Sequence, residues 1–328
     1  MMTMDVPPPT GASLLTTWTP SPVADLLIAL CVLGYAALVI RLRRSGIRWS
    51  SLRMVAAVAA AVLLVLSANS ALALYSHHLF WVHMIVHLLL ITVVPALLVW
   101  AQPIRLVHEA GGPAIRSRVD AVRGGRLFRA LLSPRLTIPL YAAVLVLTHL
   151  TGFQQAMSQH QWIHDGEMVL YLVAGYLLLL PLVGDELATV APLAYLLRFV
   201  VLAICMFPDT LVGIVLMMTN TALAPAYAAS RDWGPSAVAD QNTAGAIMWF
   251  GGDGLMMILM VVVAGRWTAG GDRRSVSLGP WLDRIRFQET LGTQDDGSID
   301  LDDDEAALAA YNARLAALHA QSRHHPKR

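Results

Sequence analysis

Residues 76–95 read SHHLFWVHMIVHLLLITVVP, and this stretch places four histidines at the head of a hydrophobic run. His77 and His78 precede the run, whereas His83 and His87 lie inside it, one helical turn apart. Ionisable side chains inside a membrane are costly and usually mark a functional site. The role of these imidazoles depends on where the run lies in a membrane. The rest of the chain predicts this position.

The composition is that of a protein that crosses a membrane several times. Hydrophobic residues make up 56% of the chain and charged residues 14%, and the mean hydropathy is +0.59. Soluble domains average about 25% charged residues. The net charge is +1 and no basic run with interleaved aromatic residues occurs, which argues against a nucleic-acid partner. We therefore expect an all-α, polytopic protein that has the lipid bilayer as a partner.

Seven hydrophobic segments are long enough to cross a bilayer, which takes about 17–25 residues in a helix. They cover residues 23–40, 54–74, 79–101, 136–153, 166–183, 193–219 and 244–267. Pro208 lies near the middle of the sixth segment and predicts a kink there. No basic residue precedes the first segment, so we expect it to stay as a membrane helix and not to be cleaved as a signal peptide.

Arginine is concentrated in alternate loops, and this pattern predicts the orientation. The 41–53 and 102–135 loops are rich in arginine. The N-terminal segment, the 75–78 turn and the 154–165 loop carry no arginine or lysine, and the 220–243 loop carries only Arg231. Positively charged loops stay in the cytoplasm. We expect a seven-transmembrane-helix bundle with its N-terminus outside and its C-terminus cytoplasmic. Alanine is abundant and Lys327 is the only lysine, which is typical of a GC-rich bacterial genome, so we expect the membrane to be the bacterial plasma membrane.

Three domains follow from this topology. Residues 1–22 form an extracytoplasmic N-terminal segment, and residues 23–267 form the seven-helix transmembrane domain. Residues 268–328 form a cytoplasmic tail with an acidic linker. In this tail, helical spacing of apolar residues predicts a short amphipathic helix, which packs on the bundle or docks a partner: Leu308, Tyr311, Leu315 and Leu318.

The histidines gather at one depth. A rise of about 1.5 Å per residue puts His83 about 6 Å and His87 about 12 Å below the outer end of the third segment. His149 ends the fourth segment near the same surface, and His160 and His164 follow in the next outer loop. Several imidazoles from three segments therefore lie in the outer leaflet or just above it.

This gathering predicts a copper site. Imidazole is the commonest metal ligand, and thioether ligands favour Cu(I). The two cysteines lie in separate apolar runs and form no metal-binding pair. Taken singly, His77 or His78 also suits an interfacial residue, and each methionine suits a packing residue. The candidate ligands are His77, His78, His83, His87, His149, His160, His164, Met84 and Met168.

Two acidic residues near the middle of the sixth and seventh segments, Asp209 and Asp253, leave two interpretations open. They line a polar pathway or anchor the copper histidines through the second ring nitrogen. Alternatively, they are buried hydrogen-bonding groups that fix helix packing. No motif of an enzyme is found: HMIVH, for example, lacks the glutamate of the His-Glu-x-x-His metalloproteases. We predict that the protein is not an enzyme.

Three stretches resemble the CtaG-type cytochrome c oxidase assembly factors of Gram-positive bacteria. They are HMIVHLLLITVVPALLVWAQP, GYLLLLPLVGDE and ADQNTAGAIMWF, within a similarity that covers roughly residues 20–268. The resemblance implies that the protein helps cytochrome c oxidase mature by delivering copper, with the oxidase subunits as partners. The matching positions are His83, Met84, His87, His149, Asp240, Gln241 and Gly245.

One departure concerns the head of the fifth segment. Where the family is expected to have Glu-His, this chain has Glu167-Met168. Either Met168 replaces an imidazole, which would favour Cu(I), or His164 serves one turn earlier.

Two other functions remain open. One is a transporter that moves copper or protons past Asp209 and Asp253. The other is a haem-binding electron carrier, in which His83 and His149 would hold the iron. The sequence leaves open the copper oxidation state and stoichiometry, the oxidase centre served, the role of the tail and whether the protein forms a homo-oligomer.

Overall fold

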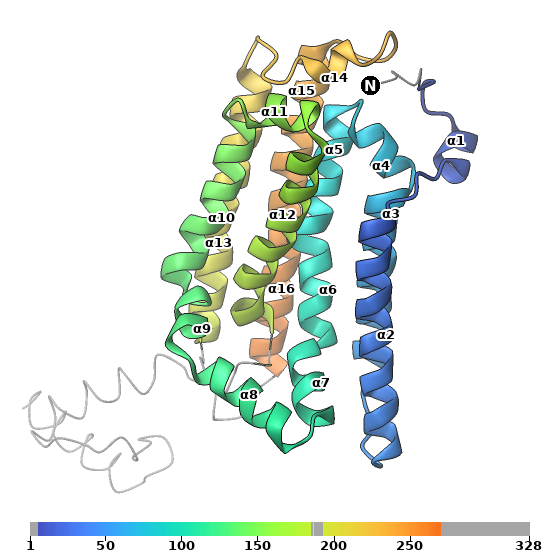
Figure 1. The fold of residues 1–328 in the computed structure, drawn as a ribbon. Coiled ribbons are helices and arrows are strands. Elements are labelled where there is room, and N and C mark those ends of the chain that lie inside the picture. The colour runs from blue at the N-terminus through green and yellow to red at the C-terminus, as the bar shows by residue number, and fades with distance from the viewer. Residues whose placement is uncertain (1–5, 185, 187–192, 270–328) are drawn as a thin grey trace, which may run out of the picture. The chain divides into compact units, whose positions relative to one another are not determined.

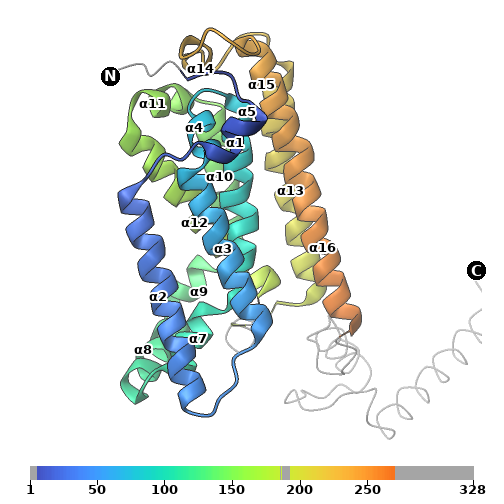
Figure 2. The same cartoon turned by 90° about the vertical axis from the view of Figure 1, so that its right-hand side faces the viewer.

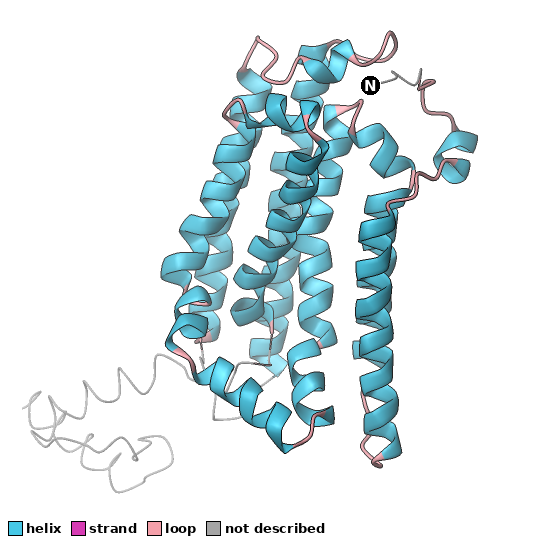
Figure 3. Ribbon diagram, viewed as in Figure 1, coloured by secondary structure: helices cyan, strands magenta, loops and turns pink. Residues whose placement is uncertain are grey.

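The computed structural model describes residues 6–184, 186 and 193–269, and every regular element in these residues is a helix (Figure 3). Long helices stand side by side in a bundle, as Figures 1 and 2 show from two sides. The long elements are α2 (Pro22–Arg44), α3 (Ser51–Asn69), α10 (Pro134–His149), α12 (Gln161–Val183), α13 (Tyr195–Met218) and α16 (Gly252–Ala269). The all-α, polytopic fold class is confirmed.

Two of the membrane helices are built from several pieces. One runs through α5 (Phe80–Leu88), the π-helix η1 (Leu89–Val93), α6 (Val94–Ala101) and α7 (Pro103–Ala110). The other runs through α15 (Ala237–Ala246), the π-helix η2 (Ile247–Gly251) and α16. Short elements join the long ones: α1 (Gly11–Thr16), α4 (Ala71–Ser76), α8 (Pro113–Gly124), α9 (Arg126–Leu131), α11 (Phe153–Gln159) and α14 (Ala226–Ala229).

Six helices in the described residues are long and apolar enough to cross a membrane. They are Pro22–Arg44, Ser51–Asn69, Phe80–Ala110, Gln161–Val183, Tyr195–Met218 and Ala237–Thr268. The expected fourth span is α10, which has 16 residues and is about 24 Å long at about 1.5 Å per residue. Because the hydrocarbon core is about 30 Å thick, the count of seven spans stays a prediction.

The arginine-rich segments lie at one end of the bundle. Elements α7, α8 and α9 and the α2–α3 connection occupy the lower end in Figure 1, whereas α4, α11 and α14 occupy the upper end. The upper end is the one that we expect to face outward. Its single expected arginine, Arg231, forms a buried ion pair with Asp240 at 3.0 Å. The arrangement agrees with the arginine pattern, and the orientation itself stays a prediction.

Several helices begin or end away from the expected bounds. Helix α12 begins at Gln161 where the sequence suggested 166, and α15 begins at Ala237 where it suggested 244. The second segment, expected at 54–74, is the helix Ser51–Asn69. Hydropathy finds only the part of a helix that suits lipid, so polar first turns are missed. As a result, His164 and Asp240 lie on helices that were expected to start after them.

Glycines allow close contacts between neighbouring helices of the bundle. A Cβ atom on Gly175 of α12 would overlap the Ile91 carbonyl oxygen of η1, so only glycine permits this approach. Gly213 of α13 and Gly245 of α15 meet in the same way, each with its Cβ position 2.7 Å from the other's carbonyl oxygen. Pro208 lies within α13, which runs from Tyr195 to Met218.

The N-terminal segment packs on the upper end. The Tyr75 hydroxyl donates to the Pro7 carbonyl at 3.2 Å, and the Trp233 ring nitrogen donates to the Val6 carbonyl at 2.5 Å. The predicted acidic linker and amphipathic helix of the tail lie outside the described residues.

Candidate metal centre

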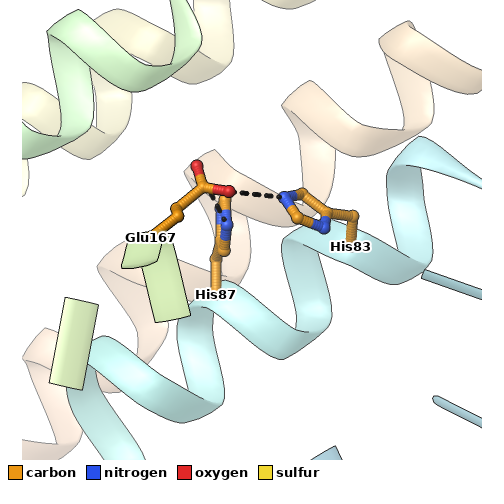
Figure 4. Close-up of side chains that lie close together, drawn as sticks. All are labelled: His83, His87 and Glu167. Atoms are coloured by element: carbon orange, nitrogen blue, oxygen red, sulfur yellow. Dashed lines mark ion pairs between the residues drawn. The ribbon is translucent and has the colours of Figure 1, made fainter. Parts of the chain in front are cut away.

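Three side chains from two helices converge inside the bundle. His83 and His87 come from α5, and Glu167 comes from the second turn of α12. Figure 4 shows the carboxylate reaching toward both imidazoles. The Nε2 atom of His83 lies 3.6 Å from Glu167 Oε2, and the Nε2 atom of His87 lies 3.5 Å from Glu167 Oε1. All three side chains are fully buried.

The spacing suits a single metal ion. One ligand atom from each of the three residues can be chosen so that all lie within 4.8 Å of one another. Two ligands bonded to one ion at about 2.0–2.1 Å and at a tetrahedral angle lie about 3.3–3.4 Å apart. The observed separations of 3.5 and 3.6 Å are close to this value. The contacts of each imidazole with the carboxylate are thus near the separation that one shared ion requires.

The hydrogen bonds of His149 assign the tautomers of two imidazoles. The Nδ1 atom of His149 lies 2.8 Å from the Leu145 carbonyl oxygen, which only accepts hydrogen bonds, so Nδ1 carries the hydrogen. In the neutral ring, His149 Nε2 is then an acceptor, and it lies 3.2 Å from His87 Nδ1. His87 Nδ1 therefore donates, and the lone pair of His87 is on Nε2, toward Glu167.

Two neighbours strengthen this assignment. The Thr148 hydroxyl donates to the Val144 carbonyl at 2.7 Å and accepts from the Tyr171 hydroxyl at 2.6 Å. The Tyr171 oxygen lies 3.2 Å from His149 Nδ1 and is free to accept from it as well. The Tyr171 ring also stacks on the His87 ring, with centroids 4.0 Å apart. The His87 imidazole is thus held in both orientation and tautomer.

The three residues form a cluster of buried polar atoms. The Nε2 atoms of both histidines and Glu167 Oε2 are buried without a hydrogen-bond partner. Leaving a buried polar atom unsatisfied costs about 1–3 kcal/mol. The lone pair on His87 Nε2 faces a carboxylate, and this arrangement is repulsive unless a positive charge lies between them. A metal ion would satisfy all three atoms together.

Neighbouring side chains position the carboxylate and enclose the imidazoles. The Gln154 amide of α11 donates to Glu167 Oε1 at 3.1 Å and leaves Oε2 free. Phe80 and Tyr227 cover His83 from the upper side, with ring centroids 6.4 and 5.9 Å from its own. The centre is therefore isolated from bulk water on these sides.

Asp240 holds the helix that carries both histidines. Its carboxylate accepts hydrogen bonds from the backbone nitrogens of Phe80 at 3.1 Å and Trp81 at 3.0 Å, at the start of α5. A carboxylate at this position satisfies free N–H groups and interacts favourably with the helix dipole. Arg231 completes the arrangement, since it donates to Asp240 and also to the His78 carbonyl.

Gln241 fixes the turn after α13. Its amide nitrogen lies within hydrogen-bonding distance of three backbone carbonyls, those of Leu216, Thr219 and Thr221, and its oxygen accepts from the Leu223 nitrogen. Asp240 and Gln241, which belong to a stretch that resembles the assembly-factor family, thus hold backbone segments near the centre. Neither residue is part of the three-residue group.

The other candidate histidines divide into two groups. His164 and His77 lie beside the centre: the ring of His164 is 5.7 Å from that of His83, and the ring of His77 is 4.4 Å from that of His164. His78 instead hydrogen-bonds Ser230 at 3.0 Å. His160 is exposed, and its ring lies 6.3 Å from that of Trp162.

The candidate methionines directly follow members of the three-residue group in sequence. Met84 is fully buried and follows His83, and Met168 is half-buried and follows Glu167. Successive side chains on an α-helix are rotated by about 100°. Each thioether is therefore turned away from the helix face that bears the ligand before it. Ligation by either methionine stays a prediction.

Asp209 and Asp253 make contacts other than the expected anchoring of histidines. The Tyr141 hydroxyl donates to Asp209 at 2.9 Å, and the Thr210 hydroxyl donates to Asp253 at 2.8 Å. The second ring nitrogen of His87 is bonded to His149. These contacts join α10 to α13 and α13 to α16, and they favour the helix-packing interpretation.

Glu167 and Tyr171 are parts of the centre that were not among the candidate residues predicted from sequence. Their signal is the spacing of His164, Glu167 and Tyr171, which fall on one face of a helix at intervals of three and four residues. The expected start of the helix at residue 166 hid this pattern, because it left His164 in a loop.

Comparisons with known proteins agree with the resemblance. The model of the cytochrome c oxidase caa3 assembly factor family (Caa3_CtaG) matches residues 33–269. Uncharacterized proteins of Mycobacterium bovis and Mycobacterium tuberculosis are each 27% identical over 320 residues, and one of Mycobacterium leprae is 26% identical. Each alignment covers 95% of this chain and 46% of the relative, so the chain spans about half the length of these proteins. No solved structure matches significantly.

Proposed function

Because the chain belongs to the cytochrome c oxidase caa3 assembly factor family, we propose that it binds copper at His83, His87 and Glu167 and passes it to the oxidase. The protein is a multi-pass protein of the bacterial plasma membrane. In this proposal copper is the cargo and the oxidase subunits are the partners. The centre lies toward the end of the bundle that we expect to face outward. An exofacial copper centre of the oxidase would be accessible from the same side of the membrane.

One observation carries the proposal: the Nε2 atoms of two imidazoles and an oxygen of one carboxylate are fully buried, lie close together and have no hydrogen-bond partner. Imidazole nitrogen suits copper. A buried centre that accepts copper also protects it from water until a partner offers other ligands. Because the family assists the assembly of cytochrome c oxidase, we infer that the bound copper serves oxidase maturation.

Metal analysis of the purified full-length protein tests the proposal. After loading with Cu(I) or Cu(II) and removal of free metal, we expect one copper ion per chain. X-ray absorption should show ligation by two imidazoles and an oxygen atom. Zinc at one ion per chain with no copper uptake would contradict the proposal, as would a protein that retains no metal.

The same sample addresses the two rival functions. A Soret band would favour the haem carrier, although the hydrogen bond between His87 and His149 occupies the His149 nitrogen that would have to face the iron. Copper uptake into vesicles that is lost in Asp209→Asn and Asp253→Asn would favour the transporter. Each of these aspartates has one buried oxygen without a hydrogen-bond partner, which is the observation in favour of transport.

His149 is predicted to act as a positioning residue and not as a ligand. Replacing His149 by Phe removes the acceptor that fixes the His87 tautomer. We expect copper affinity to fall by about 10–100-fold, the usual effect of losing a group that orients a metal-binding histidine, with one site per chain retained. Competition with a chelator measures the affinity, and His160→Phe is the matched control. Complete loss of the site would make His149 a ligand, and unchanged affinity would refute the tautomer assignment.

A further inference from the structure

A line of imidazoles connects the buried centre with the surface. His77 follows α4 and is exposed, whereas the His164 side chain, in the first turn of α12, is 12% exposed, and His83 is fully buried. The ring centroids are 4.4 Å apart from His77 to His164 and 5.7 Å apart from His164 to His83. The next ring, that of His87, is 4.0 Å from His83. Exposure therefore decreases step by step along the line.

His164 lacks the contacts of a structural histidine. Both of its ring nitrogens are buried without a hydrogen-bond partner. The Asp165 carboxylate lies 3.7 Å from His164 Nδ1, which is too far for a hydrogen bond, and Asp165 is itself largely exposed. Buried polar groups in native proteins are nearly always hydrogen-bonded, and exceptions call for an explanation. Two free imidazole nitrogens between the surface and the centre are what a transient metal ligand requires.

We propose that His77 and His164 bind copper transiently, on the path by which the ion enters the buried centre and leaves it. This inference deepens the proposed function and rests on it. His77 binds the ion when a donor at the surface releases it. His164 binds it next, and His83 then binds it in the buried centre. Each step forms one copper–nitrogen bond as another breaks, so the ion keeps its charge and no oxidant or reductant is needed.

The geometry suits this exchange of ligands. Bonds of about 2.0–2.1 Å let one ion bridge two imidazoles whose nitrogens are about 4 Å apart. The His164 ring lies between the other two, with centroids 4.4 Å from that of His77 and 5.7 Å from that of His83, so a rotation of the His164 ring turns its nitrogens toward either neighbour. On the other side, Phe80 and Tyr227 cover His83, and their rings lie 5.1 Å apart. Of these two sides of the His83 ring, the one facing His164 is thus the side that offers metal ligands.

Loading kinetics test this path separately from the buried centre. Cu(I) held by a chromogenic chelator is mixed with the full-length protein in detergent, and transfer is followed as loss of the chelate colour. In His77→Ala and in His77→Ala/His164→Ala we expect the final copper content and affinity of the wild type. The loading rate should fall by about tenfold or more in the double variant, which corresponds to about 1.4 kcal/mol in the barrier.

Matched controls make the outcome decisive. His78→Ala/His160→Ala removes two imidazoles from the same end of the bundle that lie off the line, and it should load at the wild-type rate. Wild-type loading rates in the His77/His164 variants would overturn the relay and leave the inner centre standing. Loss of the copper ion at equilibrium would also overturn it, by making these residues ligands of the inner ion. A wild-type protein that takes up no copper would refute the proposed function and the relay together.

Discussion

A strain that lacks this protein should make cytochrome c oxidase subunits that reach the membrane but have lost most of their activity. The physical reason is that a copper centre buried in a membrane protein fills slowly from free solution, whereas a donor in the same membrane passes the ion by direct ligand exchange. Oxygen consumption with reduced cytochrome c as donor measures the activity, and immunoblotting of the membrane fraction measures the subunits.

Copper added to the medium should restore part of this activity. Mass action raises the occupancy of a metal site when the free ion increases, so excess ion replaces a delivery protein but not a missing structural subunit. Full oxidase activity in the deletion strain at low copper would contradict the function proposed here. A deletion strain that stays inactive at every copper level would support a structural role in assembly in place of metal delivery.

Removing both imidazoles of α5 should abolish copper binding. The His83→Ala/His87→Ala variant leaves Glu167 as the only member of the three-residue group, and one carboxylate does not hold a copper ion against a chelator. We expect the copper content to fall from one ion per chain to none. The variant should also fail to restore oxidase activity to the deletion strain at low copper.

Two further variants keep this prediction independent of folding defects. Glu167→Gln preserves size and still accepts the hydrogen bond from Gln154, so it removes the charge with little change in packing. It should weaken copper binding strongly while the protein elutes as a folded species in size-exclusion chromatography. His78→Ala/His160→Ala, the same pair of changes outside the centre, should retain one copper ion. Restored oxidase activity from His83→Ala/His87→Ala at low copper would count decisively against delivery through this centre.

Much of the site could be predicted from sequence because depth in a membrane is a local property. Apolar length and arginine bias set where each helix crosses, and a fixed rise per residue then sets the depth of His83, His87 and His149. The intramembrane position of the two α5 histidines marked them as functional. Both imidazoles of the three-residue group could therefore be predicted from sequence, as could the presence of more histidines at the same level.

Sequence alone could not distinguish the members of the three-residue group from their neighbours. His149 was counted as a ligand candidate with His87, yet its hydrogen bonds to Leu145 and His87 make it the residue that sets the tautomer. Asp209 was a candidate anchor for histidines and instead accepts from Tyr141. Such assignments depend on which faces of two helices meet, and residues far apart in sequence decide that.

The membrane class, the arginine-rich end of the bundle and the gathering of histidines near the opposite end could all be predicted from the sequence alone. These follow from hydropathy, charge and helix geometry, which act within single segments. Only the tertiary structure showed that Glu167 of α12 faces His83 and His87, because that contact depends on the rotation and height of one helix against another. Glycines such as Gly175 permit this approach, and Asp240, bonded to the first turn of α5, keeps the two imidazoles in position.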